Sequence, residues 1–469
     1  MGKAARLFNG QAEQTLHGRV TPTPEQRQFL QNHWNALCDR IKPRLEALGY
    51  PVTTWLQGSY KYGTLIKPVH KGEEYDVDVG IYFSWDPTQS DFSPAADQLR
   101  NWVQQELIEY EKGVEELTEV VDPPKERCSR AVYKQRFHID TPTYHLDPAT
   151  DTRRLARLSG AWEKSDPKVL YKWFRDAVGS DNRDLLRRLI RYMKGWSAVA
   201  FDDAPMARPS SILLTVAITE AFIQTWGDKP VEIADDDALI AVVDLLCKRF
   251  VHERQVLNPV NCEENLNRVP DDSWGVFLTR LAVLNDAAQA AEAAEDEAAA
   301  ALHWEGAFSF LMPLPEADEV EVVEPATDRA LMQVPDIIVR VFDRQEGNLL
   351  ATHLNEVPSV TAKKWLVFEL DNKHILPAFA DISWTVRNDG DEADRTGDLG
   401  HSKRGINMLA TSESTAYLGK HYMDCVVRLN GTIFAVRRVP VHITSDPKKL
   451  LAPAQRQWTK LRTRKGRRR

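Results

Sequence analysis

Long uncharged apolar runs are missing from this sequence. No stretch of its 469 residues approaches the roughly 18 consecutive apolar residues that a membrane-spanning helix needs. The first 30 residues also lack the apolar segment of a secretory signal. We therefore expect a chain that neither enters a membrane nor is exported, with the cytoplasm as its location.

Cysteines are few and scattered. The five cysteines form no Cys-x-x-Cys pair and have no histidine at zinc-finger spacing, which argues against a structural zinc site and against a disulfide framework. Hydrophobic residues make up 43% and charged residues 27%, which is the composition of a folded globular protein. The length predicts two or three domains.

The charge is unevenly distributed. The net charge is −8, yet residues 456–469 contain eight basic residues and no acidic one. The rest of the chain is therefore strongly acidic, which makes long nucleic acid an unfavourable partner. Two interpretations of the basic tail stay open: a contact with phosphate or a partner, or a solvated segment.

The first half of the chain changes from a mixed pattern to a helical one. Thr23 is a predicted N-cap, with Gln26 completing a capping box, for a long amphipathic helix that ends near Gly49. Strands are predicted over 52–56, 77–83 and 132–139. From 167 to 302 the apolar spacing is almost wholly helical, with one Ala-rich helix over 287–301.

The C-terminal part has a period of two, which predicts a β-rich sandwich or small barrel. Strands are expected over 337–342, 365–370, 382–387 and 425–429, and Asn430-Gly431 predicts a hairpin turn. A Pro-punctuated acidic stretch precedes this part. The predicted domains are a catalytic core at 1–165, a helical lobe at 166–311, a linker at 312–330, a β-rich domain at 331–446 and a basic tail at 447–469.

Paired carboxylates are the most informative feature. On the strand 77–83 and the residues before it, Asp76 and Asp78 point to one face, while Val77 and Val79 point to the other. Neighbouring carboxylates repel each other unless a cation lies between them, and hard oxygen ligands suit Mg²⁺ or Mn²⁺. The pattern predicts a divalent metal at this strand.

Two further features extend this site. Gly58-Ser59 follows a short strand and precedes a helix, so backbone N–H groups and a hydroxyl could hold a triphosphate there. Asp140 is expected at the end of a strand, before a turn limited by Pro142, with its carboxylate on an exposed face. A third carboxylate is what a two-metal displacement requires.

These motifs resemble those of the bacterial cGAS/DncV-like nucleotidyltransferases (CD-NTases, SMODS), a branch of the polymerase-β-like superfamily. The resemblance rests on Gln57-Gly58-Ser59-x-x-Tyr62, Asp76-x-Asp78 and His138-Ile139-Asp140. It implies an α+β fold, with a polymerase-β-like core and a helical second lobe that extends to about Leu311. It also implies two Mg²⁺ ions at the three aspartates, with Ser59 on the phosphates.

Other site residues follow from weaker similarities. The segment 191–196 resembles the helix that places a triphosphate-binding lysine, here Lys194, but such a lysine can also be solvated. Ser210 and Ser211 are either phosphate or base contacts, or the N-cap of a helix. Tyr62 could stack on a base and Arg130 could bind a base edge, or both could be ordinary structural residues.

The β-rich end resembles the C-terminal sensor domain (AGS-C type) that is fused to such nucleotidyltransferases, through the segments 382–393, 403–405 and 417–425. This implies a regulatory ligand or protein at this domain or at the tail. Candidate ligand contacts are Trp384, Arg404, Tyr417 and His421, which could equally build the domain core.

The predicted function is synthesis of a cyclic di- or trinucleotide second messenger from ATP, GTP or both, with release of pyrophosphate. The resemblance places such enzymes in antiphage (CBASS) signalling, where the diffusible product reaches a downstream effector. Two alternatives stay open: an enzyme that makes linear oligoadenylates or extends RNA, and a catalytically silent nucleotide-binding sensor.

Overall fold

The structure is a computed structural model that describes residues 2–12, 14–88, 93–134, 136–227, 229–315, 335–429 and 432–445. The chain divides into two compact units. Unit 1 comprises Met1–Leu331 together with Ser383–Arg404, and unit 2 comprises Met332–Ile382 with Gly405–Arg469. None of the helices in the described ranges is long and apolar enough to cross a bilayer.

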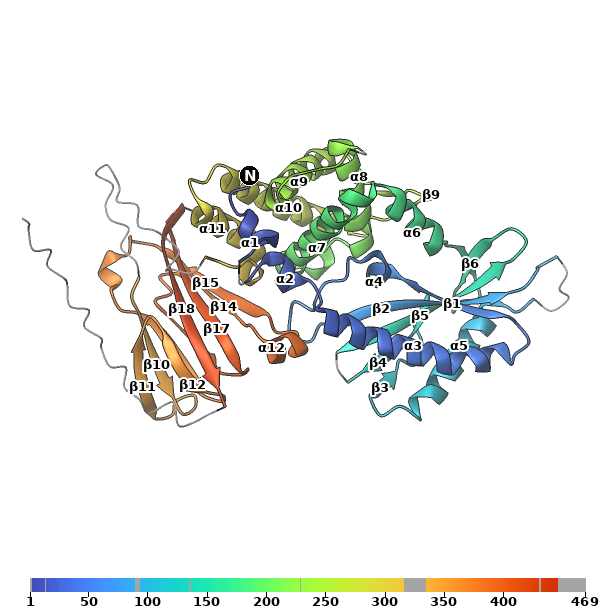
Figure 1. Cartoon of the computed structure of the whole chain (residues 1–469), viewed down its shortest axis with the longest axis horizontal. Coiled ribbons are helices and arrows are strands. Elements are labelled where there is room, and N and C mark those ends of the chain that lie inside the picture. The colour runs from blue at the N-terminus through green and yellow to red at the C-terminus, as the bar shows by residue number, and fades with distance from the viewer. Residues whose placement is uncertain are drawn as a thin grey trace, which may run out of the picture. The chain divides into compact units, whose positions relative to one another are not determined.

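A mixed sheet forms the centre of unit 1 (Figure 1). Its strand order is β1-β2-β5-β4-β3, while β6 pairs with β5 and β7 pairs with β6. Only β2 and β5 run parallel among these pairs; the others are antiparallel. The strands are β1 (Val52–Gln57), β2 (Tyr75–Ser84), β3 (Leu117–Val120), β4 (Cys128–Tyr133), β5 (Phe137–Asp147), β6 (Thr152–Ala156) and β7 (Trp162–Lys164).

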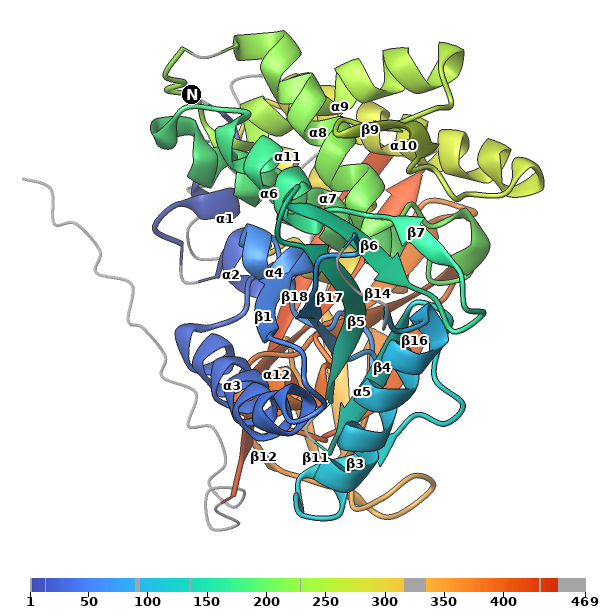
Figure 2. The same cartoon turned by 90° about the vertical axis from the view of Figure 1, so that its right-hand side faces the viewer.

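Two helices cover one face of this sheet, α3 (Pro24–Glu46) and α5 (Ala96–Glu111) (Figure 2). The predicted capping box of α3 is confirmed, because the Thr23 hydroxyl accepts from the Gln26 N–H and the Gln26 side chain accepts from the Thr23 N–H. Val77, Val79 and Ile139 are fully buried beneath these helices. The alternation of strand side chains therefore directs Asp76, Asp78 and Asp140 to the opposite face.

The predicted strand over 132–139 is wrong. The structure has two antiparallel strands there, β4 and β5, joined by a tight turn in which Arg136 has a φ of 58°. The turn has no Gly, Pro or Asn to mark it, so apolar residues on either side resemble one strand. Asp140 consequently lies inside β5, which continues past Pro142 to Asp147, and not at a strand end.

Most of the rest of unit 1 is helical (Figure 1). Helix α1 contacts α9, and helix α2 contacts α7. The predicted continuous helical region is interrupted by a hairpin of β8 (Leu257–Asn258) and β9 (Asn261–Asn265). The predicted Ala-rich helix is two helices, because Asp296 caps a new one by accepting from the Ala299 N–H. The helices are α1 (Ala5–Asn9), α2 (Leu16–Val20), α4 (Gly58–Tyr62), α6 (Pro167–Asp176), α7 (Arg183–Ala200), α8 (Ser211–Trp226), α9 (Asp235–His252), α10 (Asp271–Glu292) and α11 (Glu297–Phe308).

The C-terminal part is rich in strands, as predicted. Unit 2 has a sheet of order β11-β10-β13-β16, and in it β12, β18 and β17 are hydrogen-bonded neighbours. β17 and β18 pair antiparallel up to Leu429 and Thr432, so the predicted hairpin is confirmed, although Asn430-Gly431 lies outside the described residues. The strands are β10 (Ile337–Phe342), β11 (Leu349–Leu354), β12 (Val357–Thr361), β13 (Trp365–Leu370), β16 (Ala410–Ser414), β17 (Gly419–Leu429) and β18 (Thr432–Thr444).

One C-terminal segment clusters with unit 1. It contains most of β14 (Asp381–Arg387), the short helix α12 (Asp391–Thr396) and most of β15 (Gly400–Ile406). Most of the predicted linker and the whole predicted basic tail lie outside the described residues. The domain limits given above therefore stay a prediction.

Candidate active site

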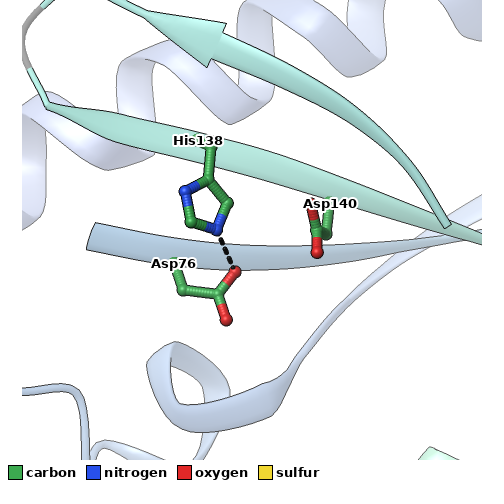
Figure 3. Close-up of side chains that lie close together, drawn as sticks. All are labelled: Asp76, His138 and Asp140. Atoms are coloured by element: carbon green, nitrogen blue, oxygen red, sulfur yellow. Dashed lines mark hydrogen bonds and ion pairs between the residues drawn. The ribbon is translucent and has the colours of Figure 1, made fainter. Parts of the chain in front are cut away.

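The pairing of β2 with β5 brings the three aspartates to adjacent positions. Asp76 and Asp78 come from β2 and Asp140 comes from β5, and the parallel register sets Asp78 beside Asp140 and Asp76 beside His138. Figure 3 shows Asp76, His138 and Asp140 directed toward one another. Asp140 is buried, Asp78 is half-buried and Asp76 is exposed.

Asp140 is held by basic side chains. The Arg130 guanidinium donates to both of its carboxylate oxygens, at 2.6 and 2.8 Å, and Lys125 Nζ lies 3.6 Å away. Burial alone would raise the pKa of Asp140, but the hydrogen bonds and charge of Arg130 outweigh burial and lower it. Arg130, which we predicted as a base contact, is thus in the structure a partner of Asp140.

His138 lies between two acidic side chains. Its Nε2 is 2.8 Å from Asp76 Oδ1 and its Nδ1 is 2.8 Å from Glu74 Oε2. Burial disfavours the charged ring, yet the hydrogen bond and charge of Asp76, helped by Glu74, raise the pKa of His138. His138 was predicted only as part of a motif and not as a site residue, although it lies two residues before Asp140 on one strand and therefore shares its face.

Asp78 differs from Asp76 and Asp140 in having no hydrogen-bonded or ion-pair partner among the described residues. Burial, together with the negative charges of Asp76 and Asp140, raises the pKa of Asp78 to about 8. The side chain lies against Gly58, whose φ is +60° and where an added Cβ would come within 2.0 Å of Asp78 Oδ2.

These donors fit a divalent cation. Asp76, His138 and Asp140 each offer a ligand atom within 4.8 Å of the others. The two carboxylates suit Mg²⁺ or Mn²⁺, whereas the imidazole of His138 would ligate a metal only in its neutral form. The unpartnered Asp78 carboxylate beside them, with its raised pKa, is the electrostatic condition that a bound cation would relieve.

A cavity of about 610 Å³ opens beside the aspartates. Its lining includes seven residues that were predicted from the sequence: Gly58, Ser59, Asp76, Asp78, Lys194, Ser210 and Ser211. A second cavity of about 460 Å³ shares Asp78, Ile212 and Arg268 with the first. Arg268 was not predicted, because it follows the β8–β9 hairpin that the helical pattern concealed.

Several predicted contact residues have other partners. Gln57 is buried; its amide donates to the Tyr82 hydroxyl and accepts from the Tyr144 hydroxyl. The Tyr62 ring is buried and stacked on Phe174, with centroids 5.1 Å apart. Tyr62 lines the first cavity and Gln57 lines the second. Their predicted contacts with a nucleotide stay predictions.

Ser210 and Lys194 also have defined partners. The Ser210 hydroxyl accepts from the Leu213 N–H and caps α8, which is the structural alternative considered for it. Lys194 is buried, and its Nζ donates to the carbonyl and hydroxyl oxygens of Thr64 at 3.1 and 3.2 Å. Burial, and then the charge of Arg191, lowers the pKa of Lys194 to about 7.

The four predicted ligand contacts of the sensor domain fall in different units. Trp384 and Arg404 belong to unit 1, where Trp384 is 1% exposed. Tyr417 and His421 belong to unit 2, where the His421 Nε2 is 2.9 Å from the Tyr417 carbonyl oxygen. A shared ligand site at these residues stays a prediction.

Comparison with known proteins supports this interpretation at two places in the chain. Residues 52–144, from β1 into β5, match the model of the nucleotidyltransferase domain of DncV-like cyclic GMP-AMP synthases. Residues 323–444 match the model of the adenylyl/guanylyl and SMODS C-terminal sensor domain.

Individual relatives and solved structures agree with these matches. The chain is 27% identical over 409 residues to a cyclic GMP-AMP synthase of Escherichia albertii, covering 87% of this chain and 88% of that protein. It is 25% identical to a c-di-GMP synthase of Roseivirga ehrenbergii, covering 51% and 66% of the two chains. The crystal structure of Vibrio cholerae DncV with the linear intermediate 5′ pppA(3′,5′)pG has a TM-score of 0.55 and 20% identity, covering 66% of this chain and 97% of that one.

The motifs, the α+β fold and the matched regions agree, and the predicted resemblance and fold class are confirmed. Residues 52–144 and 323–444 thus resemble the nucleotidyltransferase domain and the C-terminal sensor domain of cGAS/DncV-like enzymes.

Proposed function

We propose that this protein joins two ribonucleotides, from ATP, GTP or both, into a cyclic dinucleotide. The observation that carries the proposal is the set of three carboxylates on paired strands beside a cavity that also contains Ser59 and Lys194. The relatives named above are synthases of cyclic GMP-AMP and c-di-GMP. A cyclic trinucleotide is the less favoured product, because those relatives make dinucleotides.

In this proposal the ribose 2′- or 3′-hydroxyl oxygen of one nucleotide attacks the α-phosphorus of the other. A P–O bond forms, the bond to the β-phosphate oxygen breaks, and pyrophosphate leaves. Asp140 orients the attacking hydroxyl and accepts its proton, and Arg130 keeps that carboxylate ionised before the attack. A second attack of the same kind, after the linear intermediate has turned round, closes the ring.

Asp76, Asp78 and Asp140 would hold two divalent cations, with Mg²⁺ expected and Mn²⁺ as the alternative. When bound, the cations would neutralise phosphate charge and lower the pKa of the attacking hydroxyl. Ser59 and Lys194, which line the same cavity, would bind the triphosphate oxygens. The cavities that meet at Asp78 offer room for two nucleotides, one on each side of the reacting atoms.

We further propose that the product acts as a diffusible messenger in the cytoplasm and reaches an effector in antiphage defence. The resemblance to CD-NTases is the support for this role. The chain's acidic character away from its basic end disfavours a long RNA substrate.

The direct test is incubation of the full chain with ATP and GTP, singly and together, with Mg²⁺ or Mn²⁺. Mass spectrometry should then detect a cyclic dinucleotide that phosphatase does not degrade. A product with free phosphates that phosphatase removes would indicate the linear alternative. Absence of any product in every nucleotide and metal combination would favour the silent sensor.

Lys194 supplies a pH prediction. Because its pKa is lowered to about 7, the lysine is mostly neutral at pH 8, and a bound triphosphate favours the charged form. Lys194 should therefore take up close to one proton when nucleotide binds at pH 8, and the part of the affinity that depends on this lysine should fall as the pH rises above 7. Calorimetry in buffers of different ionisation enthalpy measures this uptake.

Lys194→Met should remove the uptake, while Lys248→Met, at an exposed position of α9, should keep it. Uptake that is unchanged in Lys194→Met would show that another group binds the proton.

A further inference from the structure

The loop 64–74, which we call the wall loop, joins the two halves of the active site. It runs from α4, which holds Ser59, to β2, which holds Asp76 and Asp78. Lys67 and Glu73 of this loop line the cavity of about 610 Å³ beside Asp76 and Asp78. The position of the wall loop therefore sets both the shape of the cavity and the start of the strand that presents the carboxylates.

Two contacts fix the wall loop on the side of the helical lobe. Glu73, which also accepts from the N–H of Val69 within the loop at 2.8 Å, pairs with Arg208 at 3.0 Å. His70 Nε2 lies 3.1 Å from the carbonyl oxygen of Ala198 in α7. These contacts join the loop to elements that also border the cavity.

A third attachment comes from residues 388–399, which we call the α12 segment. Asp394 of this segment pairs with Lys67, with 2.5 Å between Oδ2 and Nζ, and Lys67 is only 6% exposed. Gly397 ends α12 in the left-handed conformation, and an added Cβ there would lie 3.0 Å from the Pro68 side chain. The α12 segment thus contacts consecutive residues of the wall loop, through a charge and through close packing.

Polar contacts attach the α12 segment to other parts of unit 1. The Arg19 guanidinium donates to the carbonyl oxygens of Asn388, at 3.3 Å, and Leu399, at 2.8 Å. Arg136 donates to the carbonyl oxygen of Thr396. The two arginines thus hold the segment at Asn388, Thr396 and Leu399.

Helix α12 itself is not part of a packed core. Of its six residues only Ala393 is buried, and Asp394 borders a cavity of about 900 Å³. A segment that is attached through few apolar contacts can be released without unfolding the core.

The α12 segment lies within the range that matches the sensor-domain model, 323–444. The chain passes from unit 2 into unit 1 at Ser383 and back after Arg404. We propose that the α12 segment positions the wall loop of the nucleotidyltransferase, with Asp394 as the positioning residue. The sensor-domain sequence thereby sets how well the cavity binds nucleotide. This inference rests on the proposed function, in which the cavity of about 610 Å³ binds nucleotide.

The test compares Asp394→Asn with Asp391→Asn in the full chain. The two substitutions remove the same charge from the same short helix, but only Asp394 pairs with Lys67. Asp394→Asn should raise the KM for ATP and GTP roughly tenfold, which corresponds to about 1.4 kcal/mol, with a smaller change in kcat. Asp391→Asn should leave both close to the values of the unchanged protein.

A second readout does not depend on catalysis. Hydrogen–deuterium exchange of the wall-loop amides, without nucleotide, should be faster in Asp394→Asn and normal in Asp391→Asn. Asp394→Glu, which restores the charge, should return the exchange toward normal. Lys67→Met combined with Asp394→Asn should accelerate it no more than either change alone.

Exchange and KM that are both unchanged in Asp394→Asn would overturn the inference. Faster exchange in a protein that transfers no nucleotide under any condition would support the positioning role and contradict the proposed function. One experiment can therefore overturn the positioning role without overturning the proposed function, and the reverse also holds.

Discussion

Asp78→Asn is expected to lower nucleotide turnover by on the order of a thousandfold, as loss of a group that acts at the reacting centre does in other enzymes. The same change should stabilise the nucleotide-free protein. Asp78 is a half-buried carboxylate beside Asp76 and Asp140 without a partner of its own in the described ranges, and its pKa is raised to about 8. Asparagine removes the repelled charge and keeps the shape.

The sign of the pH dependence follows from this pKa. Between the ordinary value of 3.8 and about 8, the folded state binds the Asp78 proton more tightly than the unfolded state does. The contribution of Asp78 to stability therefore decreases as the pH rises through this range. Without divalent cations, the melting temperatures of the two proteins should differ less at pH 5 than at pH 8, with Asp78→Asn the higher at pH 8.

Asp39→Asn is the matched control, because Asp39 is exposed on α3, against the other face of the sheet. It should alter neither turnover nor the pH dependence of melting. Turnover of Asp78→Asn within tenfold of the unchanged protein would contradict the proposed site. A lower melting temperature at pH 8 would contradict the electrostatic account of Asp78.

Gly58→Ala is expected to lower turnover by about a hundredfold, because small displacements of reacting groups have effects of that size. The new Cβ would come within 2.0 Å of Asp78 Oδ2, so the carboxylate would have to move from its position beside Asp140. The φ of +60° at this residue adds a backbone cost of about 1–2 kcal/mol for a residue with a side chain. Steady-state turnover and thermal unfolding, measured together, separate the two effects.

Gly49→Ala distinguishes the effect of backbone strain from the effect of a steric clash with Asp78. Gly49 also has a positive φ, +96°, but an added Cβ there meets no atom within 4 Å. It should show a comparable loss of stability with turnover nearly unchanged. If both substitutions reduced turnover equally, the contact between Gly58 and Asp78 would not be the cause.

Local patterns predicted those features of the fold and of the site that depend on residues close together in one helix or strand. The capping box of Thr23 and Gln26 and the alternation around Asp76 and Asp78 were predictable, because both depend on spacings of two to four residues within one element. The turn between β4 and β5 was missed, because its residues carry no turn signature.

The partner of each charged group was decided by the tertiary structure. Arg130 meets Asp140 only because an antiparallel pair sets them in register, and no sequence pattern distinguishes that role from a base contact. The same holds for Tyr62, which Phe174 covers, and for the pair of Lys67 with Asp394, 327 residues apart.

The sequence by itself thus determined which residue types are available for metal and phosphate chemistry and on which face of a strand they lie. The structure decided which charges are paired, which are buried, and therefore which pKa values move. The physical reason is that alternation and capping act between residues close in the chain, whereas burial and ion pairing depend on groups that folding brings together from distant segments.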